Sequence, residues 1–141
     1  EGWAVAQRAQ DEEPEPEIEV FIADNPAEYG LWYRLAPVTF LGGSLFGKGP
    51  TRNPMEPAAL GSAILHGPRT GTAGPVFVRL GAARATRAVA SASDLGDALG
   101  DLLAPDRAAR LAQAAWGVVS EGAEVTEGVL FRIRAIMDGE T

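Results

Sequence analysis

The chain has 141 residues, 46% of them hydrophobic and 22% charged, which is the composition of a globular protein with room for one core. With no cysteine and a single histidine, His66, the sequence excludes disulfides, thiolate metal sites and histidine-cluster metal sites. No apolar run approaches the roughly 20 residues that span a bilayer, and the acidic opening does not resemble a signal peptide, so we expect a cytosolic compartment.

The net charge of −7 is unevenly distributed along the chain. Residues 1–28 hold nine Asp or Glu residues against Arg8 alone, whereas between Arg34 and Arg87 seven basic residues face only Glu56. This basic centre favours an anionic ligand over nucleic acid, for which we expect more Lys and Arg with interleaved aromatic residues. The alternative, that these arginines only decorate loops and helix ends, stays open.

Strand-like and helix-like segments alternate through the first two thirds of the chain. β-branched, aromatic and apolar residues predict strands at 2–9, 18–23, 37–41, 63–65 and 86–90, the second buried and the last at an edge. Apolar spacing and Ser or Pro start signals predict helices at 28–35, 57–60, 76–80, 93–103, with Ser93 as the cap, 105–120 and 125–137. We therefore expect an α/β fold, a Rossmann-like parallel sheet with right-handed crossovers and flanking helices, with a helical C-terminal part at about 93–138.

The stretch from Thr39 to Gly61 carries the most distinctive pattern. An apolar run ends in a glycine pair, crosses a Gly/Pro-rich loop and meets a helix start, which is how α/β proteins seat a phosphate or nucleotide. Gly42 to Lys48 matches G-x-x-x-x-G-K, but position 49 is Gly and Pro50 blocks the helix that a P-loop needs. The sequence therefore argues against a P-loop.

The remaining interpretation is an anion site at a helix N-terminus, in the segment Asn53-Pro54-Met55-Glu56-Pro57. Asn is a strong N-cap, Pro suits the first turn, and a Glu three residues after the cap resembles a capping box. Because Pro57 disfavours the α conformation at Glu56, we expect the helix to begin at Pro57, with Glu56 free to accept both hydroxyls of a ribose. The glycine pair leaves room for a phosphate near backbone N–H groups. An ordinary capped helix is the structural alternative.

Three motifs stand together in this region: D-x-x-x-E in D-N-P-A-E-Y-G-L-W-Y-R-L-A-P-V-T-F-L-G-G-S-L, then G-G-S-L, then N-P-x-E-P in R-N-P-M-E-P-A-A-L-G-S-A-I-L-H-G-P. Over about Gly2 to Asp138 the sequence resembles the C-terminal domain of the Kdo transferases. Those enzymes move 3-deoxy-D-manno-octulosonic acid (Kdo) from CMP-Kdo to the lipid A precursor of lipopolysaccharide. The resemblance implies that residues 1–141 are part of the donor-binding C-terminal domain of a two-domain GT-B glycosyltransferase.

The resemblance also implies which residues contact CMP. The family's M-G-E and N-x-x-E segments fall on Pro26, Ala27 and Glu28 and on Asn53, Pro54, Met55 and Glu56. In the family pattern Asn53 helps to hold the phosphate and Glu56 holds the ribose hydroxyls. The loop wall beside the nucleotide is implied at Gly42, Gly43, Ser44 and Arg52. The sequence departs from the family at Pro26 and Ala27, which replace Met and Gly, and at Arg52, which replaces His.

No catalytic residue, metal or cofactor is implied within the chain. The family's catalytic glutamate, its surface for the lipid A precursor and its membrane anchor lie in an N-terminal domain. We therefore expect a soluble fragment without transferase activity of its own, from a protein at the cytoplasmic face of the inner membrane, with CMP-Kdo as donor. The alternatives are another GT-B transferase that uses a UDP- or ADP-sugar, and a non-catalytic nucleotide-binding module.

Overall fold

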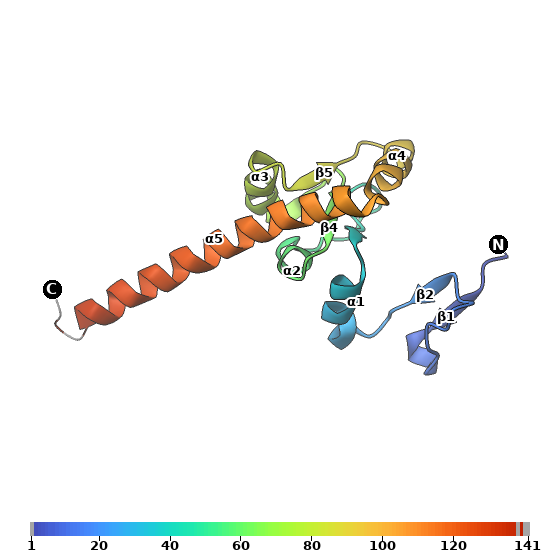
Figure 1. Cartoon of the computed structure of the whole chain (residues 1–141), viewed down its shortest axis with the longest axis horizontal. Coiled ribbons are helices and arrows are strands. Elements are labelled where there is room, and N and C mark those ends of the chain that lie inside the picture. Colours follow the sequence, from blue (N-terminus) through green and yellow to red (C-terminus); the bar gives the residue numbers. More distant parts are fainter. Residues whose placement is uncertain (1, 138, 140–141) are drawn as a thin grey trace. The chain divides into compact units, whose positions relative to one another are not determined.

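The computed structural model describes residues 2–137 and 139, apart from the side chains of residues 122–129 and 131. The chain divides into two compact units, Glu1–Trp32 and Tyr33–Thr141. The strands are β1 (Val5–Gln7), β2 (Val20–Ile22), β3 (Val38–Phe40), β4 (Ala63–His66) and β5 (Thr86–Ala88), as labelled in Figure 1. The α-helices are α1 (Tyr29–Leu35), α2 (Met55–Ala59), α3 (Gly74–Ala82), α4 (Ala92–Leu102) and α5 (Pro105–Met137). Short 3₁₀ turns lie at Arg8–Gln10, Pro26–Glu28 and Gly71–Ala73.

The first unit is built on β1 and β2, which pair in parallel with Val5 opposite Val20. We predicted β2 to be buried, and this is wrong: Val20 is 42% and Ile22 is 43% exposed. A two-stranded sheet in so short a unit offers little apolar surface for a strand to pack against. The β-branched residues therefore form the strand without burying it.

The second unit contains a three-stranded parallel sheet in the order β3-β4-β5. The parallel pairing and the edge position of β5 are as predicted, but the strands form two sheets rather than one. All four residues of the central strand β4 are buried. A parallel strand covered on both faces has no exposed side, so its sequence is a continuous run, A-I-L-H, instead of an alternation.

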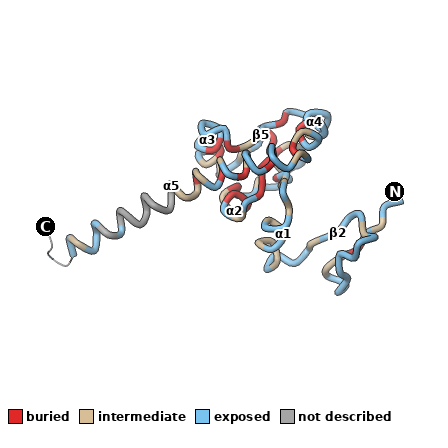
Figure 2. Tube along the Cα trace, viewed as in Figure 1, coloured by how far each residue is buried: buried red, intermediate tan, exposed pale blue. Residues whose placement is uncertain are grey.

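The two faces of β4 pack against different sets of helices, with α5 reaching both, because successive side chains of a strand point to opposite faces. Ile64 joins a core cluster to which α2, α3 and α5 contribute, among others, Ala58, Phe77, Leu80, Ala115 and Val118. Leu65 joins a second cluster with Val89 and with Ala98 and Leu102 of α4. Figure 2 shows the buried residues gathered in β4 and the helices around it. The core therefore lies around the central strand.

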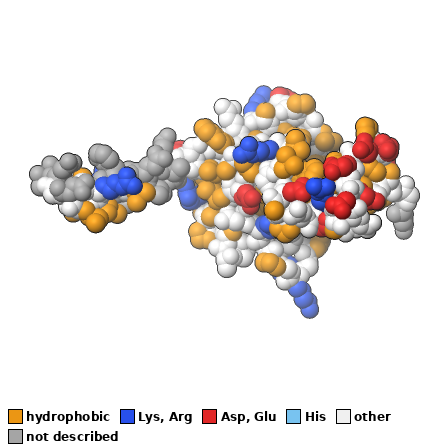
Figure 3. All heavy atoms as spheres, turned by 90° about the horizontal axis from the view of Figure 1, so that it is seen from below, with side chains coloured by type: hydrophobic (Ala, Val, Ile, Leu, Met, Phe, Trp, Pro, Cys, Tyr) orange, Lys and Arg blue, Asp and Glu red, His pale blue; other side chains and the backbone are white. Residues whose placement is uncertain are grey.

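The helix α5 corrects a second prediction, because residues 105–137 form one helix where we expected two. No proline interrupts the segment after Pro105, and its glycines, Gly117, Gly122 and Gly128, each cost a helix only about 1 kcal/mol. Ala108, Ala112 and Ala115 recur at helical spacing and bring α5 close to the core. Hydrophobic side chains stay exposed near its end, visible in Figure 3: Leu130, Ile133, Ile136 and Met137. Among the described residues, no helix combines the length and apolar character that a membrane span requires.

The start of α4 corrects a third prediction. Ser91, not Ser93, caps the helix: its Oγ accepts a hydrogen bond of 3.1 Å from the N–H of Asp94. The carboxylate of Asp94 in turn accepts from the N–H of Ala90 at 3.1 Å. These reciprocal bonds satisfy two backbone donors at the helix start, which is why Ser91 is the better cap.

Candidate functional site

Ser44 joins the loop after β3 to the loop after β4. Its side chain is fully buried, and its Oγ donates to the carbonyl of Leu41 at 2.5 Å and accepts from the N–H of Gly67 at 2.8 Å. The Ser44 carbonyl accepts from the N–H of Arg69 at 2.8 Å. Because the hydroxyl both donates and accepts a hydrogen bond, Ser44 fixes the shape of the loop at the carboxyl ends of two neighbouring strands.

Two glycines in these loops are required by close backbone approach. A Cβ on Gly67 would lie 2.4 Å from the carbonyl oxygen of Ser44, and a Cβ on Gly43 would lie 2.8 Å from that of Pro50. Gly43 also has a φ of +82°, which disfavours any side chain. Around Gly42, in contrast, a Cβ would meet nothing within 4 Å. Gly43 and Gly67 thus let the loop pack against itself, while the space beside Gly42 is open.

The far part of the same loop is tied to Arg69. The Arg69 guanidinium donates to the carbonyl of Gly47, and the hydroxyl of Thr51 donates to the Arg69 carbonyl. Together with Ser44, these contacts hold residues 44–51 against the chain that follows β4. The loop therefore reaches Asn53 with several of its residues already fixed.

The helix α2 begins at Met55, so our prediction that it begins at Pro57 is wrong. Asn53 Oδ1 accepts from the N–H of Met55 at 2.9 Å and turns the chain into the helix. Pro57 is tolerated because the first N–H groups of a helix have no intrahelical partner, and its fixed φ suits the first turn. The preference of a pre-proline residue is a bias, and here the buried packing of Pro57 outweighs it.

Glu56 therefore lies in the first turn of α2, and its side chain is exposed. Within the described part of the chain, its carboxylate has no hydrogen-bond or ion-pair partner. Asn53 is exposed as well; its amide oxygen accepts from Met55, and its NH₂ group has no acceptor among the residues that the structure describes. The start of α2 thus presents a carboxylate acceptor and an amide donor. Arg52, also exposed, precedes them.

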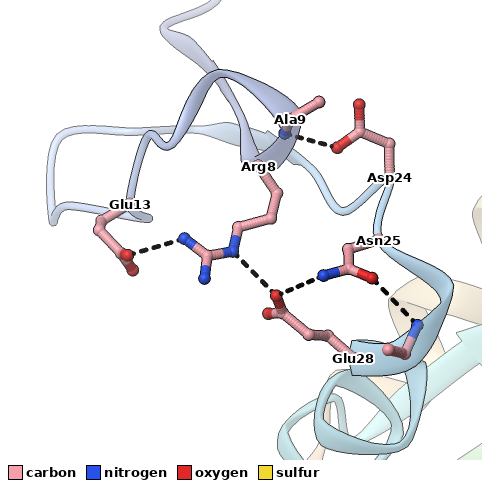
Figure 4. Close-up of polar contacts among 7 residues, drawn as sticks. Arg8, Ala9, Glu13, Asp24, Asn25 and Glu28 are labelled. Carbon is pink, nitrogen blue, oxygen red and sulfur yellow. Dashed lines mark hydrogen bonds and ion pairs between the residues drawn. The ribbon is translucent and has the colours of Figure 1, made fainter.

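Glu28, on the first unit, is held by a network of polar contacts (Figure 4). Its Oε1 accepts from Arg8 Nε at 2.9 Å and from Asn25 Nδ2 at 3.0 Å. Arg8 also pairs with Glu13 at 3.0 Å, and the hydrogen bond from Arg8 to Glu28 raises the pKa of the guanidinium. Asn25 Oδ1 accepts from the N–H of Ala27 at 3.1 Å. The segment Pro26–Glu28 is thus fixed by its own unit.

Asp24 anchors the 3₁₀ turn after β1 to the segment that carries Glu28. Its carboxylate accepts from Gln7 Nε2 at 2.6 Å and from the N–H of Ala9 at 2.8 Å. The hydrogen bond from Gln7 is the main cause that lowers the pKa of Asp24; the bond from Ala9 acts in the same sense and burial opposes both. Since the charged form is the one that accepts both bonds, this anchor depends on pH.

The anchor is expected to weaken in acid. A carboxyl whose folded pKa lies below its unfolded value of about 3.9 contributes stability above that pH and loses it as the pH falls through the folded pKa. We expect the amide signal of Ala9 to titrate in an NMR experiment with a midpoint below about pH 4. In the variant Asp24→Asn this titration disappears. An Ala9 signal that does not change over this range would contradict the role of Asp24.

His66 is a structural residue in this arrangement, as its position beside a Gly-Pro turn suggests. It is buried, its Nδ1 lies 2.8 Å from the carbonyl of Gly67 and its Nε2 lies 3.2 Å from the hydroxyl of Thr86. Its ring packs on Phe77 with the centroids 4.5 Å apart. The described residues contain no group of three His, Cys, Asp or Glu side chains that could hold a metal.

The residues implied as CMP contacts fall into two groups. Asn53, Pro54, Met55 and Glu56 lie with the loop residues Gly42, Gly43, Ser44 and Arg52 on the second unit. Pro26, Ala27 and Glu28 lie on the first. Sequence reasoning missed Arg8 as the partner of Glu28, although a lone cation in an acidic segment was a signal for it. It also missed the contact between Ser44 and Gly67 that holds two loops together, because no local sequence pattern predicts such a contact.

The fold and the loops at the ends of the strands show what class of domain this is. Parallel strands, flanking helices and a fixed loop before a short helix form an α/β domain of the kind found in the C-terminal half of GT-B glycosyltransferases. No protein-family model matches the chain. Among solved structures, it is similar to the C-terminal CMP-Kdo binding domain of WaaA from Acinetobacter baumannii, with a TM-score of 0.76 and 27% sequence identity.

The match covers 83% of this chain and 61% of that chain, so this chain spans less than two thirds of the structure it resembles. The predicted resemblance to the C-terminal domain of a Kdo glycosyltransferase is thereby confirmed in structure.

Proposed function

We propose that this chain is the donor-binding part of a glycosyltransferase and that its donor is CMP-Kdo. The observation that carries the proposal is the likeness, over 83% of the chain, to a domain described as binding CMP-Kdo. The motifs N-P-x-E-P and G-G-S-L, on which the family resemblance rests, lie at the start of α2 and in the loop after β3.

The start of α2 offers the chemistry that a ribose phosphate needs. The carboxylate of Glu56, which has no partner within the described part of the chain, can accept hydrogen bonds from two neighbouring ribose hydroxyls. Because Met55 occupies the amide oxygen of Asn53, the NH₂ group is left to donate to a phosphate oxygen. Pro54 is buried and Met55 is half-buried, and the N–H of Met55 holds the side chain of Asn53. An acceptor for the sugar and a donor for the phosphate are thus three residues apart.

The loop residues take different parts in the proposal. Ser44 is buried with its hydroxyl engaged, so its contribution is to hold the loop in shape. Gly42 and Gly43 supply the bend beside which the open space lies. Arg52 supplies positive charge in the residue before Asn53.

The contacts proposed for Pro26, Ala27 and Glu28 form a separate assignment. The N–H of Ala27 already donates to Asn25, and Oε1 of Glu28 accepts from Arg8 and Asn25. A nucleotide contact from this segment therefore involves the second carboxylate oxygen of Glu28, or the apolar surface of Pro26 and Ala27. Arg8 orients Glu28 in either case.

Transfer of Kdo to the lipid A precursor, at the cytoplasmic face of the inner membrane, is proposed for the whole transferase. This part rests on the family resemblance alone. The catalytic base is proposed to come from the N-terminal domain of the GT-B pair, where it deprotonates the acceptor hydroxyl.

Calorimetric titration of the chain with CMP, UMP and AMP tests the proposal. We expect CMP to bind most tightly. A protein group that accepts a hydrogen bond from the amino group of cytosine is left buried and without a partner when uracil takes the place of cytosine. Tighter binding of UMP or AMP would point to a UDP- or ADP-sugar transferase instead. Absence of binding by all three nucleotides would contradict a donor site in this chain.

A further inference from the structure

A cavity lies at the end of the sheet opposite the loop that precedes α2. It has a volume of about 380 Å³, and its lining includes Arg84, Arg87, Asp101, Arg107 and Arg110. Arg84 lies two residues before β5, and the end of α4 and the start of α5 supply the other wall. Parallel strands place their amino ends together, so this cavity, called here the arginine groove, is separate from the carboxyl-end loops.

The arginine groove carries an excess of positive charge. Its lining holds four arginines and one carboxylate, that of Asp101. Asp101 pairs with both Arg87 and Arg107, each at 3.3 Å, so one negative charge is shared between two guanidinium groups. In a protein with a net charge of −7, such a concentration of unbalanced arginine is a local feature that an anion can neutralise.

Two arginines of the groove, Arg84 and Arg110, are available to a ligand because neither forms a close ion pair with a described carboxylate. Arg110 has only a loose pair with Asp106, at 3.8 Å, and its side chain is 81% exposed. The guanidinium of Arg84 has no hydrogen-bond or ion-pair partner among the described residues. Arg84 and Arg110 therefore bring charges to the groove that no carboxylate among the described residues approaches more closely than 3.8 Å.

The backbone conformation of Arg84 is unusual for a residue other than glycine. Its φ is +53°, and it follows α3 at the place where a glycine usually ends a helix. The N–H of Arg84 donates to Gly81 at 3.0 Å and that of Ala85 donates to Leu80 at 2.8 Å, which is the Schellman pattern. A left-handed conformation is disfavoured for arginine, yet it places a guanidinium in the lining of the groove.

We infer that the arginine groove binds a phosphate ester other than the donor nucleotide. Guanidinium forks match phosphate oxygens in pairs, which a compact ammonium group does not. A volume of about 380 Å³ lies within the range of small-molecule sites, and Leu102 and Leu111 give the lining an apolar part. The phosphate belongs either to a soluble phosphate ester or to an anionic lipid headgroup, and the two sources share this chemistry.

The test uses two probes, inorganic pyrophosphate and vesicles of phosphatidylcholine with or without phosphatidylglycerol. The variant Arg84→Gly with Arg110→Ala removes the two outer charges while glycine suits the backbone at position 84. The control, Arg132→Ala with Arg134→Ala, removes equal charge from exposed positions near the end of α5. Melting curves verify that both variants fold.

We expect the unmodified chain to bind at least one probe, with an affinity that falls as salt is raised. The groove variant should bind at least about tenfold more weakly, and the control should stay within about twofold. Binding of pyrophosphate identifies a soluble ester, and binding of only the phosphatidylglycerol vesicles identifies a headgroup. No binding of either probe, or equal losses in the two variants, would overturn the inference.

Discussion

Replacing Glu56 with Gln should weaken the binding of CMP by about 1–3 kcal/mol, the value of hydrogen bonds to a charged group. This corresponds to a loss of roughly 5- to 150-fold in affinity. The carboxylate is exposed and, within the described residues, has no protein partner, so the substitution breaks no hydrogen bond or ion pair among them. An affinity that falls while the melting temperature stays constant identifies Glu56 as a ligand contact.

Glu121→Gln is the matched control for this experiment. Glu121 is also an exposed glutamate on a helix, α5, and it lies outside the loop region. The control removes the same charge, so any long-range electrostatic effect appears in both variants. If both variants bind CMP as the unmodified chain does, Glu56 does not hold the ribose.

Replacing Gly67 with Ala should lower the free energy of unfolding by about 2–4 kcal/mol, which is a large effect for one methyl group. The added Cβ would lie 2.4 Å from the carbonyl oxygen of Ser44 and 2.6 Å from the Cα of Leu45. Both are backbone atoms, and Ser44 is held by its buried hydrogen bonds to Leu41 and Gly67. The loops therefore cannot separate without breaking these bonds.

Gly96→Ala provides the opposite control. Gly96 lies inside α4, and a Cβ there would meet no atom within 4 Å. We expect this change to stabilise the protein by roughly 0.5–1 kcal/mol, since alanine loses less backbone entropy than glycine in a helix. Urea denaturation measures both variants. Equal stability of the two would show that the contact between Gly67 and Ser44 can relax freely.

The second unit was predictable because its patterns are local. A continuous apolar run such as A-I-L, at residues 63–65, is typical of a buried parallel strand, and the alanines of α5 recur at helical spacing. The errors came where tertiary context decides. Val20 and Ile22 favour a strand but do not reveal whether anything covers it, and no local rule told whether one helix or two would follow Pro105.

In the candidate site too, the sequence predicted the local features but not the contacts between distant residues. The N-P-x-E-P motif located the start of α2 to within two residues, although the pre-proline bias at Glu56 gave way to packing of Pro57. The contacts of Ser44 with Gly67 and of Arg8 with Glu28 join residues about 20 positions apart. Such pairs have no signature in composition or periodicity, so only the fold reveals them.

NMR spectra of the ¹⁵N-labelled chain, recorded as CMP is added, test the central proposal most directly. We expect saturable shifts in the amides of Asn53, Met55, Glu56 and Ala58, at the start of α2. The amides of the arginine groove at Arg84 and Arg110 should stay unchanged. Shifts confined to the arginine groove, or amides around Glu56 that stay in place while CMP saturates the chain, would contradict a donor site in this loop.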